Sequence, residues 1–174
     1  NTSNVTDMSG LFWGASNFNE DIGNWDVSNV TNMISMFNAA RKFNQYIGNW
    51  NTSKVTDMTA MFSRASAFNQ DINTKVVNLG ETNEYIAWDI SNVTGRGITY
   101  FFYEATAFDT DIGNWNTSKV DILDSLFRGA SKFNQNINTK EVTLDNGTTY
   151  TAWDVSNKDT QSVFRDAVAF NQSL

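Results

Sequence analysis

The sequence predicts a repeat solenoid, with short parallel strands on one side, short helices on the other and two inserted β-hairpins. The first observation is a stretch that recurs almost letter for letter at residues 18–37, 43–62 and 108–127. The second is a column of tryptophans whose gaps are 25, 38, 27 and 38 residues. Such a period is typical of stacked repeats that bury their apolar faces on one another. The column consists of Trp25, Trp50, Trp88, Trp115 and Trp153.

We expect one domain over residues 1–174, made of about six partial or complete repeats. Six copies of the second half of the repeat are marked by Phe12, Phe37, Phe62, Phe102, Phe127 and Phe164. Residues 1–8 match the middle of a repeat, and the last residues stop just after another repeat begins. The chain is therefore expected to be a segment of a longer array.

The second half of each repeat predicts a short helix. Apolar residues recur at i, i+3, i+4 and i+7, which is the spacing of one helix face. Thr6 precedes this pattern in the position of an N-cap. We expect a helix of two to three turns over residues 6–16, and its equivalent in the other copies. The residues that set the spacing are Met8, Leu11, Phe12 and Ala15.

The first half of each repeat has no helical period. Ile22, Trp25 and Val27 predict a short strand. After the second phenylalanine of each copy an asparagine recurs, with one aspartate in its place. We expect this column to turn inward and to bond the backbone at a corner of the solenoid, rather than to bind a ligand. Its members are Asn19, Asn44, Asn69, Asp109, Asn134 and Asn171.

Two insertions, at residues 73–87 and 138–152, predict β-hairpins that leave the solenoid on the same side. In the second, apolar and polar residues alternate on both sides of an Asp-Asn-Gly turn at 145–147. The first aligns with it position by position. Its extra apolar residues, Val76 and Ile86, lie on the opposite face and are expected to cover either the adjacent repeat or a partner.

The composition argues against several classes of partner. The formal net charge is −7, with 12 Lys and Arg against 19 Asp and Glu. This balance disfavours nucleic acid and anionic membrane surfaces. The chain has no Cys, His or Pro, which rules out disulfides and thiolate or histidine zinc sites. No segment has the apolar length of a membrane span. We expect a monomer without direct membrane insertion.

Two strings carry a family resemblance: WDVSNVTNMISMFNAARKFNQYIGNW at 25–50 and YTAWDVSN at 150–157. They resemble the BspA-like surface proteins, bacterial leucine-rich-repeat-like arrays of about 25 residues that also occur in mycoplasma lipoproteins. The resemblance covers essentially the whole chain. It implies a leucine-rich-repeat-like curve, an extracellular or cell-surface location and a role in adhesion. It carries no catalytic motif.

The sequence does not predict an enzyme, because its titratable residues include no evident acid–base pair and no nucleophile with its base. Three carboxylates share one repeat position, and a tyrosine and an asparagine take that position in other copies. Calcium favours such oxygen ligands, but the spacing of known calcium repeats is missing. No cofactor is expected, and calcium is kept as an alternative. The column consists of Asp21, Tyr46, Asp71, Asp111 and Asn136.

The expected function is a non-catalytic, surface-displayed binding or adhesion module that contacts a protein, for example one of the host extracellular matrix. The alternatives are a structural spacer or stalk, and a calcium- or glycan-binding repeat. The tryptophan column is expected to be buried, whereas Trp13 lies outside it and is expected to be partly exposed. The hairpin tip at 80–83 is expected to take part in capture. The candidate binding residues are Trp13, Asp21, Tyr46, Asp71, Asp111, Val76 and Ile86.

Overall fold

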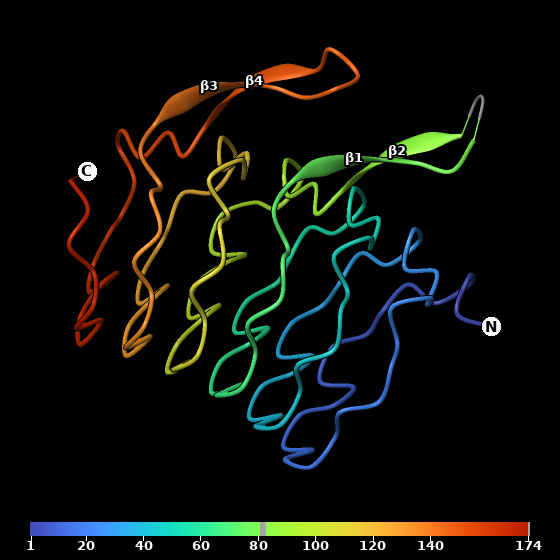
Figure 1. The fold of residues 1–174 in the computed structure, drawn as a ribbon, viewed down its shortest axis with the longest axis horizontal. Helices are drawn as coiled ribbons and strands as arrows, with labels where there is room; N and C mark the ends of the chain where they lie inside the picture. The colour runs from blue at the N-terminus through green and yellow to red at the C-terminus, as the bar shows by residue number, and fades with distance from the viewer. Residues whose placement is uncertain (81–82, 174) are drawn as a thin grey trace.

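The structure, a computed structural model, describes residues 1–80 and 83–173 as a stack of similar coils along one axis (Figure 1). Backbone hydrogen bonds join each coil to the next. Gly10 N–H donates to the Ile34 carbonyl (2.8 Å), and Phe12 N–H donates to the Met36 carbonyl (2.9 Å). The same bonds recur one repeat later, as from Phe37 to Met61 (2.9 Å). One sequence repeat therefore forms one coil.

The prediction of helices is wrong. The predicted leucine-rich-repeat-like solenoid, with parallel strands on one side and helices on the other, is therefore wrong as well. The described residues contain no helix. Residues 6–16 form successive turns in which an N–H bonds to the carbonyl three residues earlier, as from Leu11 to Met8 (3.2 Å). The intervening N–H groups donate to carbonyls of the next coil instead of to the carbonyl four residues earlier. The hydrogen-bond pattern of an α-helix therefore does not form.

Left-handed backbone conformations explain why these segments cannot be helical. In the first coil Gly10 and Gly14 have φ of 61° and 71°. Other coils have non-glycine residues at these positions, and the left-handed conformation costs each of them roughly 1–2 kcal/mol. The hydrogen bonds between coils hold this conformation in place. The non-glycine residues concerned are Ser35, Ala39, Ala60, Arg64, Tyr100, Glu104, Ser125, Ser162 and Asp166.

The parallel strands expected around the tryptophans are also absent from the described residues. Parallel pairing is limited to isolated bridges, such as Asp7 with Asn32 and Asn32 with Asp57. The strands of the described chain form two separate two-stranded antiparallel sheets. These are β1 (Lys75–Asn78) with β2 (Glu84–Ala87), and β3 (Lys140–Thr143) with β4 (Thr149–Ala152).

The two hairpins are thus confirmed, and both lie along the same edge of the stack (Figure 1). Val77 pairs with Tyr85 in the first, and Val142 pairs with Tyr150 in the second. Gly147, with φ of 83°, forms the turn of the second hairpin, where only glycine takes up this conformation without strain. Residues 81–82, part of the expected capture tip of the first hairpin, lie outside the described residues.

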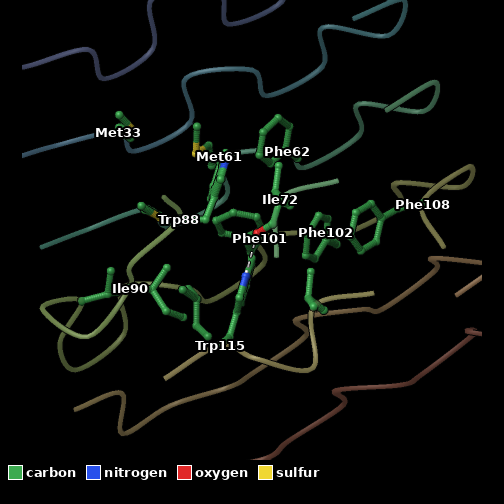
Figure 2. Packing of buried hydrophobic residues seen from close by; sticks show 14 of the residues in the cluster. Met33, Met61, Phe62, Ile72, Trp88, Ile90, Phe101, Phe102, Phe108 and Trp115 are labelled. Carbon is green, nitrogen blue, oxygen red and sulfur yellow. Dashed lines mark hydrogen bonds between the residues drawn. The ribbon is translucent and has the colours of Figure 1, made fainter. Parts of the chain in front are cut away.

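The core is made of aromatic columns that run along the stack. Within a coil the two phenylalanine rings stack at 3.8–4.0 Å between centroids. Between coils, rings of the first column lie 5.3–6.2 Å apart. Figure 2 shows part of this packing around Phe62, Phe102 and Phe108. Each repeat therefore covers its aromatic rings with those of its neighbours.

The tryptophan column is buried, as predicted, in all coils except the first. Trp50, Trp88, Trp115 and Trp153 are at most 1% exposed, and Trp25 is half-buried. Each of these four indole N–H groups donates to an isoleucine carbonyl of the preceding coil, for example Trp88 to Ile47 (2.9 Å). These residues pack in the core of the stack and donate to its backbone carbonyls. They are therefore unavailable to a glycan.

Replacing Ala40 by leucine is expected to destabilise the stack by about 1–3 kcal/mol, because added methylenes overpack a filled core. Ala40 is fully buried at the turn between the two phenylalanine columns. Urea unfolding followed by circular dichroism measures the change in the free energy of unfolding. Ala107→Leu, at a partly exposed position, is the control. An equal, small effect of both substitutions would contradict tight packing at Ala40.

No helix in the described part of the chain combines the length and the apolar character needed to cross a membrane.

Candidate binding surfaces

The asparagine column links the backbones of successive coils. The Asn19 side-chain oxygen accepts the Asn44 N–H (2.8 Å), and the Asn44 side-chain oxygen accepts the Asn69 N–H (2.9 Å). The series continues to Asn171. The predicted role in backbone hydrogen bonding is confirmed. The inward direction is wrong for Asn44, which is exposed and bonds along the stack.

The column of candidate binding residues faces outward in every coil. Its side chains are exposed, and most cap their own turns. The Asp21 carboxylate accepts the Gly23 N–H (2.9 Å), and the Asp111 carboxylate accepts the Gly113 N–H (2.7 Å). Among residues 1–80 and 83–173, no three carboxylates gather as a metal-ligating group. The three carboxylates of this column, Asp21, Asp71 and Asp111, come from three different coils.

The first hairpin folds back onto this column at Tyr46. Lys75, the first residue of β1, donates to the Asp71 carboxylate (2.8 Å) and to the Tyr46 hydroxyl (3.1 Å). Its ammonium also lies 5.5 Å from the centre of the Tyr46 ring. The Tyr46 hydroxyl donates a hydrogen bond to the side-chain oxygen of Asn49 (3.0 Å), and the Tyr85 hydroxyl donates one to the backbone carbonyl of Asn49 (2.6 Å). We call these five residues the hairpin face.

The titration of the hairpin face follows from these contacts. Burial lowers the pKa of Lys75, but its bonds to Asp71 and Tyr46 outweigh burial and raise the pKa above the usual value. Burial raises the pKa of Tyr85. In the second hairpin, burial raises the pKa of Tyr150 to about 12, and its hydroxyl donates to a backbone carbonyl of the preceding coil. At neutral pH the lysine is charged and these two phenols are neutral donors.

The two hairpins differ on the face that the sequence singled out. Val76 pairs with Ile86, and both are half-buried against the core. In the second hairpin the same positions hold Glu141 and Thr151, which bond to each other (2.7 Å). The apolar face of the first hairpin therefore packs on the stack.

Trp13 lies on a different surface from the hairpin face. It is 67% exposed, and Leu11 beside it is 50% exposed. Its segment forms one of the loops at the end of the coils opposite the hairpins (Figure 1). We call these loops the turn edge. Its segments are residues 13–17, 38–42, 63–67, 103–107, 128–132 and 165–169.

The turn edge carries an arginine–tyrosine cluster that was not predicted from the sequence. Two guanidinium groups from different coils lie near the Tyr103 ring, Arg64 at 5.4 Å and Arg128 at 5.7 Å from its centre. Glu104 pairs with Arg64 (3.1 Å) and raises its pKa. Tyr100 lies edge-on to Tyr103 at 5.9 Å. Counting charges by repeat position, instead of over the whole chain, would have revealed the cluster.

The structure thus joins some of the predicted binding residues and separates others. Tyr46 and Asp71 meet at the root of the first hairpin, with Lys75, Asn49 and Tyr85 that the sequence did not single out. Asp111 lies next to this group, because its carboxylate accepts the side-chain N–H of Asn73 at the root of the hairpin (3.1 Å). The other predicted residues lie apart from it: Asp21 caps a turn of its own coil, Val76 and Ile86 face the core, and Trp13 lies at the turn edge.

Comparison with known proteins shows a family. The family model described as "Mycoplasma protein of unknown function, DUF285" matches twice, over residues 1–87 and 75–174. The two matches together span the chain and agree with its repeated coils. Neither the curated proteins nor the solved structures contain a match to the chain. The chain therefore belongs to the DUF285 family of mycoplasma repeat proteins.

Proposed function

We propose that the chain is a non-catalytic binding module, displayed on the cell surface, that captures a host or matrix protein through the hairpin face. One observation carries this proposal. Tyr46 remains 45% exposed while its hydroxyl bonds to Lys75 and Asn49, and Asp71 in turn accepts a hydrogen bond from Lys75. Tyrosine is enriched among the residues that dominate binding energy at interfaces, and a fixed ring loses little entropy on binding.

The surroundings of Tyr46 support the same proposal. The hairpin and the column belong to different coils, yet they form one continuous surface because Lys75 and Tyr85 bond back onto the preceding coil. Most repeated positions take part in packing or in bonds between coils. Extra chain at a position that varies between copies is where a ligand contact is expected. The resemblance to BspA-like surface proteins supports an extracellular location, which antibody labelling of intact cells would test.

Replacing Tyr46 by alanine is expected to weaken capture about ten-fold or more, because it removes the exposed ring at the centre of the hairpin face. The measurement is surface binding to a panel of purified matrix proteins, such as laminin, collagen and fibronectin. Stability should change by less than about 1 kcal/mol, since the side chain is half exposed.

Asn136→Ala is the matched control, because Asn136 takes the same column position in another coil and is exposed. It should leave capture unchanged. Unchanged capture by both Tyr46→Ala and Lys75→Ala would contradict the proposal and would favour the spacer.

A further inference from the structure

The turn edge has the opposite charge from the rest of the molecule. It contains six of the chain's twelve Lys and Arg but only two of its nineteen Asp and Glu. The chain as a whole has a net charge of −7. The acidic residues therefore lie almost entirely away from the turn edge. The six cations are Arg41, Lys42, Arg64, Arg128, Lys132 and Arg165.

Few of these cations are neutralised by the chain itself. Arg64 pairs with Glu104 at 3.1 Å, and Arg165 approaches Asp166 at 3.8 Å. The other four form no ion pair within the described ranges 1–80 and 83–173. Like charges along one edge repel one another and destabilise the compact state. An anion bound along the edge would relieve this repulsion.

The cations are arranged in a row. Successive coils place their rings 5.3–6.2 Å apart, and each loop of the turn edge lies beside the next along the stack (Figure 1). Tyr103 positions two of the guanidiniums, because Arg64 and Arg128 both lie against its ring. Arginine held in this way loses less freedom when it binds, and its planar fork suits oxyanions.

We propose that the turn edge binds a linear sulfated polysaccharide laid along the stack axis. Arg64 and Arg128 donate to its sulfate groups. The exposed Trp13 contacts its sugar rings, and so does Tyr100, which lies beside the edge next to Tyr103. This inference rests on the proposed function in one respect, surface display, which exposes the edge to extracellular polysaccharides. Nucleic acid is disfavoured because the binding of a single strand relies on aromatic rings that stack with successive bases. The exposed aromatic residues Trp13 and Tyr100 lie three coils apart.

The test compares heparin binding by two variants that lose the same charge. Arg64→Gln/Arg128→Gln removes the two guanidiniums beside Tyr103. Lys54→Gln/Lys119→Gln, the control, removes two ammonium groups outside the turn edge that donate to Asn29 (2.6 Å) and Asn92 (2.7 Å). Fluorescence titration with heparin should show affinity lowered about ten-fold or more in the first variant and within about two-fold in the second. Thermal melts confirm folding.

Three outcomes would overturn the proposal. The first is equal weakening in both variants, which would mean that only net charge matters. The second is equal affinity for desulfated heparin. The third is displacement of heparin by a single-stranded oligonucleotide at lower concentration, which would favour nucleic acid. Tyr46→Ala separates this test from the proposed function, because it should weaken protein capture and retain heparin binding. Loss of heparin binding alone would overturn only the present inference.

Discussion

Replacing Trp115 by alanine is expected to lower the free energy of unfolding by about 3–5 kcal/mol. Trp115 is fully buried and lies between the rings of Phe102 (6.0 Å) and Trp153 (6.1 Å). Its indole N–H donates to the Ile72 carbonyl at 2.9 Å (Figure 2). The substitution therefore opens a cavity in the middle of the stack and leaves a buried carbonyl without its partner.

The measurement is urea unfolding, with a thermal melt in parallel. A fall in Tm of roughly 10 °C or more corresponds to the expected loss for a chain of this size. Trp115→Phe should fall between the wild type and alanine, because it retains a ring and loses the N–H. Trp13→Ala is the exposed control and should change stability by less than about 1 kcal/mol. A loss below about 1 kcal/mol for Trp115→Ala would contradict a structural role for the column.

Replacing Gly48 by alanine is expected to cost about 3 kcal/mol, at the upper end of overpacking effects. A Cβ at Gly48 would lie 2.5 Å from the Asp71 carbonyl oxygen of the next coil and 2.6 Å from the Tyr46 ring. The carbonyl belongs to the backbone and cannot move away without separating the coils. The substitution should therefore also displace Tyr46 and weaken protein capture.

Gly14→Ala is the matched control for this prediction. A Cβ there meets nothing within 4 Å, and the next coil already has Ala39 at the same position with φ of 60°. It should cost about 1 kcal/mol through backbone strain alone. Urea unfolding of both variants distinguishes steric exclusion from conformational preference. Equal losses in the two variants would show that the close approach at Gly48 is not limiting.

The hairpin face was only partly predictable from the sequence. Tyr46 stood out because it interrupts a column of polar residues, and the insertion at 73–87 stood out as extra chain. Nothing in the sequence indicated that Lys75 would reach across to Tyr46, since they are 29 residues apart and belong to different coils. The contact depends on the direction in which the hairpin folds back, which only the packed coils determine.

The turn edge was missed for a related reason. The net charge of −7 argued against anionic partners, and that argument averages over the whole chain. Stacking collects one short loop from each repeat into a single edge, so segments with a local excess of cations become neighbours. Arg64 and Arg128 lie far apart in the sequence, yet both contact Tyr103.

The sequence by itself determined the repeat, the buried aromatic columns and the two hairpins. Recurrent apolar identities specify which side chains are buried, and alternation around a glycine turn specifies a hairpin. Only the tertiary structure decided the backbone path. The spacing of Met33, Met36, Phe37 and Ala40 suits a helix face and a series of turns equally well. The turns prevail because alternate N–H groups find carbonyl partners in the next coil, some 24 residues away, which a local pattern cannot reveal.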